Sequence, residues 1–284
     1  MKIKKFLEII WNEFVYGGHL LSLGAVSIVL TSAILLDSKI TWDFLLIVYL
    51  GVQSIYLYDR YRGFKKDALT NPERTKHIEK YVKYIPLIIL FFSFIIVAIV
   101  IYFNIRALPF IILMLLLGLF YSISLKKLTQ KIVGFKTFFV SLMWALLVMV
   151  LAIYYSLLFN LALFFIFIFI FLKCFIIISF FDIKDIESDK KEGLLTLANV
   201  WGQKKLIDIL KLITLLAIIP IILGFYLGLL PLFSLMLIFT IPYTFYYLKK
   251  SKDKKTDISF LNNVIADGEP ILWLFLILFG KILL

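Results

Sequence analysis

Two segments of the chain carry aspartates at spacings that gather carboxylates on one side of a helix. In the first segment Asp59 and Asp67 are eight residues apart, and in the second Asp182, Asp185 and Asp189 follow at intervals of three and four. Residues three, four, seven or eight apart share a helix face, so each set predicts a patch of carboxylates pointing one way. Paired oxygen ligands beside a membrane suit Mg²⁺ that carries a phosphorylated substrate.

The elements that must position these patches are apolar and recur along the whole chain. Of its 284 residues 63% are hydrophobic, and the mean hydropathy is +1.02, well above that of a soluble domain. Each apolar run has about 17–21 residues, enough for a helix to cross a membrane. The runs are 19–36, 42–58, 84–104, 107–125, 135–153, 161–181, 207–227, 230–248 and 264–284. We therefore predict an all-α membrane protein with nine transmembrane helices, forming a single domain over residues 1–284.

The basic residues predict the orientation of these spans. Of the 30 lysines and arginines, 25 fall before the first run or in the connections after the second, fourth, sixth and eighth runs. This bias places the N-terminus and both aspartate segments in the cytoplasm and the C-terminus on the opposite side. Residues 1–18 are expected to form a short amphipathic helix on the cytoplasmic face. The net charge of +12 then reflects this bias and attraction to anionic lipid, and requires no nucleic acid partner.

A few charged residues fall within or beside the runs. Lys173 lies in mid-span, where a charge costs about 2.5–3.5 kcal/mol, so we expect it to face a cavity or to pair with a polar group on a neighbouring span. His19 and His77 are expected at the membrane interface or in a loop. Asp267 and Glu269 are expected to cap the last span at the interface.

Considered alone, the second segment fits either a metal site or a solvated helix end paired with neighbouring lysines. The residues that follow favour the metal site, because Gly193, Thr196, Leu197 and Gly202 continue the pattern. An Asp-x-x-Asp-x-x-x-Asp segment, then Gly-x-x-Thr-Leu and a closing Gly, resembles the UbiA superfamily of intramembrane prenyltransferases.

The first segment resembles the same family with three departures. The family's Asn-Asp-x-x-Asp-x-x-x-Asp pattern, followed by a proline and an arginine, aligns without gaps from Asp59 through Pro72 and Arg74. Asp59 then takes the asparagine position and Asp67 the last aspartate position. Arg60 and Gly63 replace the other two aspartates. A third match begins at Tyr121-Ser122 and ends at Lys126, as in the family's Tyr-Ser/Thr…Lys before the fifth span.

The resemblance implies nine helices around a central cavity that opens to the cytoplasmic side. It implies transfer of an isoprenyl group from a prenyl diphosphate to a hydrophobic acceptor within the lipid bilayer, with Mg²⁺ as cofactor. The implied metal ligands are Asp59, Asp67, Asp182, Asp185 and Asp189. The implied diphosphate-binding residues are Arg74, Tyr121 and Lys126. The implied catalytic residues are Asp59, Asp67, Asp182, Asp185 and Lys126. The sequence names neither the acceptor nor the oligomeric state.

Gly63 leaves an alternative open. Asp59 restores a negative charge one turn earlier on the same face, so the ligand set of the first segment can be displaced rather than lost. The alternative is a non-catalytic lipid-binding protein or carrier on the same scaffold. A cation-coupled transporter is less favoured, because the carboxylates lie at span ends and not at the midplane.

Overall fold

The computed structural model describes residues 2–253 and 255–284, with the side chains of 2–5, 65–67, 69, 70 and 126 outside the description. Every regular element in these ranges is helical. The helices form two compact units, one of Met1–Val26 and Thr41–Ser124, the other of Ser27–Ile40 and Leu125–Leu284. The expected all-helical fold class is therefore confirmed.

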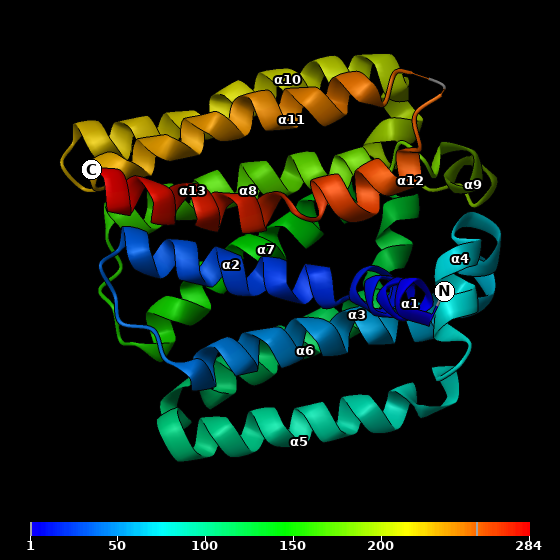
Figure 1. Cartoon of the computed structure of the whole chain (residues 1–284), viewed down its shortest axis with the longest axis horizontal. Coiled ribbons are helices and arrows are strands. Elements are labelled where there is room, and N and C mark those ends of the chain that lie inside the picture. The colour runs from blue at the N-terminus through cyan, green and yellow to red at the C-terminus, as the bar shows by residue number, and fades with distance from the viewer. Residues whose placement is uncertain (1, 254) are drawn as a thin grey trace. The chain divides into compact units, whose positions relative to one another are not determined.

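The first unit is built around a long helix that carries the first aspartate segment. Its elements are α1 (Lys2–Tyr16), the start of α2 (His19–Leu35), α3 (Trp42–Thr70), α4 (Pro72–Ile78), α5 (Ile85–Asn104) and α6 (Leu108–Ile123). Pro72, Pro86 and Pro109 stand in the first turns of α4, α5 and α6, where a missing N–H costs nothing. Both α5 and α6 pack against α3, and they lie side by side (Figure 1).

The second unit holds the remaining helices. They are α7 (Phe135–Tyr154), α8 (Leu161–Phe181), α9 (Ile186–Lys191), α10 (Leu197–Tyr226), η4 (Leu232–Phe239), α11 (Thr240–Lys250), α12 (Ile258–Phe260), the π-helical η5 (Leu261–Ala266) and α13 (Glu269–Leu283). The apolar helix α8 packs against both α7 and α10, and α10 runs beside α11 (Figure 1). The second aspartate segment therefore follows the best-packed helix of this unit.

Many of these helices expose apolar side chains, as helices in lipid do. In the described residues six helical stretches are long and apolar enough to cross a membrane, or seven if the bent pair of α1 and α2 is one span. In α5, Leu87, Leu90 and Phe94 are each at least 65% exposed. Exposed apolar surface of this extent does not suit a soluble monomer and is consistent with an integral membrane protein.

A buried ion pair joins three helices inside the second unit. Lys173 of α8 contacts Glu269 at the start of α13, and both side chains are fully buried. Lys173 Nζ also donates to Thr244 Oγ1 at 2.7 Å, and the Tyr247 hydroxyl donates to Glu269 Oε2 at 2.9 Å. The expected pairing of Lys173 with a neighbouring span is confirmed. The expectation that Glu269 is an interfacial cap is wrong, since burial beside Lys173 makes it a core counter-ion.

A second polar cluster ties α1 to α2, α3 and α4. Glu13 accepts from His77 Nε2 at 2.7 Å and lies 3.4 Å from His19 Nε2. His19 Nδ1 lies 2.5 Å from the Tyr49 hydroxyl. The two histidines are therefore not isolated interface or loop residues, because helix packing brings both to one carboxylate from positions distant in sequence.

Candidate active site

The second aspartate segment is a turn, and not the single helix face predicted from its spacing. Helix α8 ends at Phe181, and α9 begins only at Ile186. Between α8 and α9 the backbone forms hydrogen bonds to the residue three positions earlier, as in a 3₁₀ turn. Asp185 N donates to Asp182 O at 3.3 Å. Helix C-termini commonly tighten in this way to satisfy their last carbonyls. The three aspartates are thus arranged around a bend.

This carboxylate turn nevertheless keeps its charges close together. Asp182 is fully buried, and Lys136 Nζ of α7 donates a hydrogen bond to its Oδ1 atom at 2.5 Å. Burial raises the pKa of Asp189 to about 6, the Lys136 charge opposes this rise, and the negative charges of Asp182 and Asp185 add to it. A buried carboxylate crowded by like charges is a group that a cation would stabilise in its ionised form.

The glycine and threonine that follow shape the return of the chain. Gly193 has φ +66°, a left-handed conformation that ends α9. Leu194 N then donates to Asp189 O at 2.9 Å. Thr196 is the N-cap of α10, and its hydroxyl donates to Asp189 Oδ2 at 3.2 Å. The Gly-x-x-Thr spacing therefore orients Asp189.

The loop after α6 is fixed against this turn by three hydrogen bonds. Leu195 N donates to Thr129 O at 2.8 Å, and Gly134 N donates to Leu195 O at 2.9 Å. Gln130 Nε2 donates to Glu192 O at 3.1 Å. Lys126 belongs to this loop, in η3 (Leu125–Gln130), but its side chain lies outside the described residues.

The first aspartate segment is a continuous helix, as its spacing predicts. Helix α3 runs unbroken past Asp59 and Asp67, so their backbone positions share a face. The half-buried Asp59 accepts from Ser122 Oγ of α6 at 2.9 Å. The side chain of Asp67 lies outside the described residues.

Two of the three departures from the family pattern, Arg60 and Gly63, have different surroundings. Arg60 is only 5% exposed and packs against Gly18, where an added Cβ would lie 2.5 Å from Arg60 Nη1. Gly63 is half-buried and lies one turn after Asp59 on α3. Arg60 is therefore a packed residue of the first unit and not a solvated surface arginine.

The remaining diphosphate-binding candidates also lie in the first unit. Arg74 of α4 and Tyr121 of α6 are both half-buried, and the Arg74 Nε and Tyr121 hydroxyl atoms are enclosed. Sequence reasoning assigned no site role to Lys136 or Ser122, although both contact predicted aspartates. Ser122 stands inside the third matched motif, which could have marked it, whereas nothing in the pattern marked Lys136.

Comparison with known families decides the assignment. The sequence model of the UbiA prenyltransferase family matches residues 20–277. The chain belongs to this family. No curated protein matches it in sequence. The UbiA resemblance predicted from the aspartate segments is therefore confirmed.

Solved structures of UbiA homologues share the fold at low sequence identity. A homologue from Aeropyrum pernix K1 in its apo form has a TM-score of 0.70 at 14% identity, covering 92% of this chain and 96% of that one. An Archaeoglobus fulgidus homologue bound to GPP and Mg²⁺ has a TM-score of 0.67 at 15% identity, covering 95% and 98%. A digeranylgeranylglyceryl phosphate synthase structure has a TM-score of 0.62 at 15% identity, covering 98% and 100%.

Proposed function

We propose that this chain transfers an isoprenyl group from a prenyl diphosphate to a hydrophobic acceptor within the membrane, with Mg²⁺ as cofactor. The observation that carries the proposal is the carboxylate turn, in a chain that belongs to a prenyltransferase family. Asp189 there is buried, hydrogen-bonded and crowded by two further aspartates. UbiA homologues bound to DMAPP or GPP together with Mg²⁺ support the substrate class.

The donor set fits a metal that is shared with the substrate. Among the described side chains no three acidic, histidine or cysteine groups converge as a closed metal site. Mg²⁺ is typically bound through one or two carboxylates together with substrate phosphates and water. When bound, it would supply positive charge that stabilises the departing diphosphate. We propose that the turn with Asp182, Asp185 and Asp189 supplies the carboxylates for one such ion, and that Asp59 and Asp67 supply those for another, with substrate phosphates and water completing each ligand set.

The protein's own groups have separate roles in this proposal. Lys126, Arg74 and Tyr121 would bind the diphosphate, with the lysine and arginine adding charge where the allylic C–O bond breaks. Thr196 and Lys136 would orient Asp189 and Asp182, since each contacts its carboxylate directly. Carboxylates held by such partners keep their geometry without a metal, which lowers the cost of binding one.

The proposed assay uses the purified protein with a radiolabelled prenyl diphosphate, Mg²⁺ and a membrane lipid extract. We expect label in a new lipid-soluble product, and we expect EDTA to abolish its formation. Bound label that is never transferred, with or without Mg²⁺, would support the non-catalytic carrier. The replacement of family aspartates by Arg60 and Gly63 is the observation that favours this second candidate.

A substitution at Asp59 tests whether the first metal site is displaced rather than lost. Asp59→Asn should slow transfer by about tenfold or more, because it removes one carboxylate ligand. Gly63→Asp should leave the rate unchanged or raise it, since it restores a carboxylate on the face of Asp59 and Asp67. Transfer rates would be measured across a Mg²⁺ titration. Ser122→Ala is the control, because it removes only the hydrogen bond to Asp59 and keeps the carboxylate.

Two results would count against this assignment. An active wild type whose rate and Mg²⁺ dependence survive Asp59→Asn would place the first metal elsewhere. An inactive wild type that gains transferase activity with Arg60→Asp and Gly63→Asp together would establish the chain as a decayed enzyme.

We also propose nine spans within one UbiA-like domain. The stretch Val82–Ile123 has 42 residues, about 63 Å as a straight helix, roughly twice the hydrocarbon thickness. It turns at η2 (Ile105–Ala107), so α5 and α6 supply two spans. Helices α2, α3, α7, α8 and α10, η4 with α11, and α12 with α13 supply the others. The central cavity implied by the resemblance stays a prediction.

The orientation of the spans gives a direct test. A reporter fused after Lys255 should report the cytoplasm, and one fused after Leu284 should report the opposite side, because the basic connections alternate through nine spans. The measurement uses a pair of fusions, a phosphatase and a fluorescent protein, which together report on both sides of the membrane. Both fusions on the same side would overturn the span count.

A further inference from the structure

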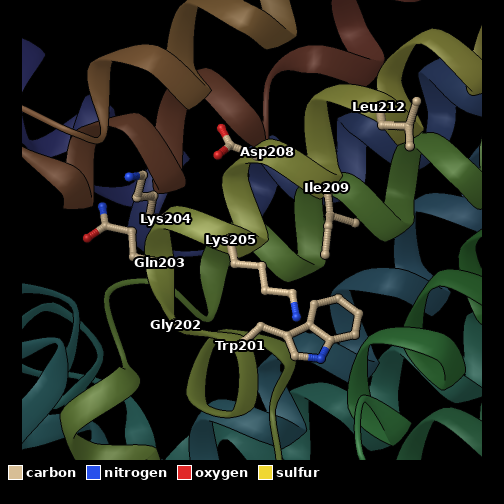
Figure 2. A pocket seen from close by; sticks show the side chains of 8 residues that line it. All are labelled: Trp201, Gly202, Gln203, Lys204, Lys205, Asp208, Ile209 and Leu212. Atoms are coloured by element: carbon tan, nitrogen blue, oxygen red, sulfur yellow. The ribbon is translucent and has the colours of Figure 1, made fainter.

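An open groove lies beside the first turns of α10, where this helix enters its apolar stretch. Its volume is about 650 Å³, within the usual range of small-molecule sites. The lining includes Trp201, Gly202, Lys204, Lys205, Ile209 and Leu212. Figure 2 shows the Lys205, Ile209 and Leu212 side chains leaving the same side of the helix, with the Trp201 indole at the end of that row. The groove thus joins a basic end to an apolar wall.

The helix backbone is interrupted at Gly202, which lines this groove. Gly202 has φ +74° and ψ +159°, which interrupts the helix between Trp201 and Gln203. An L-residue rarely adopts this conformation, and glycine does so without steric cost. Gln203 Nε2 donates to Ser251 O at 2.9 Å, which holds the far side of the break against the end of α11. The backbone of the groove's first turn is therefore fixed on both sides of the break.

The charges along the groove are not balanced. Asp208 is already paired, since it lies 3.4 Å from Lys252 Nζ and 3.8 Å from Lys211 Nζ. In residues 2–253 and 255–284, neither Lys204 nor Lys205 has a carboxylate within ion-pair distance. Figure 2 shows the two side chains leaving opposite sides of the helix, with only Lys205 pointing toward the Trp201 indole. On that side the groove therefore offers one exposed ammonium group to an anion.

The apolar wall continues as a stripe along α10. Ile209, Leu212, Leu216 and Ile219 follow Lys205 at helical spacing, and the last three are each more than 40% exposed. From Ile209 to Ile219 the helix rises about 15 Å, which is half of a roughly 30 Å hydrocarbon core. The stripe thus has the length of one acyl chain of one leaflet.

We propose that this groove binds an anionic phospholipid of the bilayer. Its phosphate would lie at Lys205, its acyl chain along the stripe, and the Trp201 indole at headgroup level, where tryptophan is favoured. Charge complementarity selects an anionic headgroup over a zwitterionic one, because neighbouring Asp208 is neutralised within the protein. The site rests on membrane insertion alone and is independent of the prenyl transfer proposed above.

The test measures binding of phosphatidylglycerol and phosphatidylcholine to the delipidated full chain by native mass spectrometry. We expect wild type to retain phosphatidylglycerol in preference. Lys205→Ala should weaken its binding by about fivefold, the contribution of one lysine near an anionic lipid. Lys204→Ala is the matched control, because it removes an exposed lysine on the opposite side of the same helix and should leave binding unchanged.

A second readout keeps the result independent of total charge. Phosphatidylglycerol with brominated acyl chains should quench tryptophan emission. Trp201→Phe should remove most of this quenching, and Lys205→Ala should reduce it. Equal binding of both lipids, or unchanged binding in the Lys205→Ala variant, would overturn the proposal. Displacement of the lipid by inorganic diphosphate at equal concentration would instead assign the groove to the diphosphate of a soluble or lipid substrate.

Discussion

Replacing Asp182 with asparagine is expected to lower prenyl transfer by about two orders of magnitude or more, because it removes a carboxylate from the proposed metal site. The protein should stay folded, since asparagine has the same shape and Lys136, which is partly exposed, can be solvated. The measurement is transfer of radiolabel across a Mg²⁺ titration, with the melting temperature of the detergent-solubilised protein recorded for each variant.

A control variant nearby tests whether the loss of any negative charge would lower the rate of transfer, or only the loss of a proposed metal ligand. Glu187→Gln removes one exposed negative charge from α9 and should leave the rate unchanged. Lys136→Met should have an intermediate effect of about 10–100-fold, as is typical when a residue that orients a metal ligand is lost. Equal rates for Asp182→Asn and Glu187→Gln would contradict the metal assignment.

The second large effect is on stability. Glu269→Gln is expected to destabilise the fold by about 3–5 kcal/mol, because it leaves the fully buried Lys173 ammonium without a counter-ion. Thr244 would still accept one hydrogen bond from Lys173, and Tyr247 could still donate to the new amide. Unfolding by titration with SDS in mixed micelles gives the free energy.

The double variant separates the cost of an unpaired charge from the value of the pair. Lys173→Met with Glu269→Gln contains no buried charge and should recover most of the lost stability, because neutral replacement of a buried pair is often tolerated. Tyr247→Phe removes a single hydrogen bond and should cost only about 1 kcal/mol. A Glu269→Gln protein as stable as wild type would mean that the ammonium finds water or another partner.

The elements of the fold were predictable where one physical signal dominates. Long apolar runs predicted helices because a spanning segment must satisfy its backbone internally, and Lys173 predicted a polar partner because a mid-span charge is costly. The identity of that partner, Glu269, was not predictable. Packing of α13 against α8 brings together residues almost a hundred positions apart, and no local pattern records such a contact.

The candidate site was predictable in its residues and less so in its geometry. The spacing of Asp59 and Asp67 agrees with the continuous helix α3. The same reasoning failed for Asp182, Asp185 and Asp189, because the chain leaves the helix at Phe181 and turns. Nothing in the helical period distinguishes a helix that continues from one that ends. Gly193 was the available signal, since its left-handed conformation closes the turn four residues after Asp189.

The hydrogen bonds between Thr129, Gly134 and Leu195 have a mechanical consequence. Leu195 donates to the loop after α6 through its N–H and accepts from that loop through its carbonyl oxygen. A shift of either loop would therefore pull on the other. The loop that carries Lys126 and the loop that closes the carboxylate turn therefore behave as one body. Any opening that admits or releases a bulky molecule must then bend at the helix ends on either side of this pair, because the pair itself does not part.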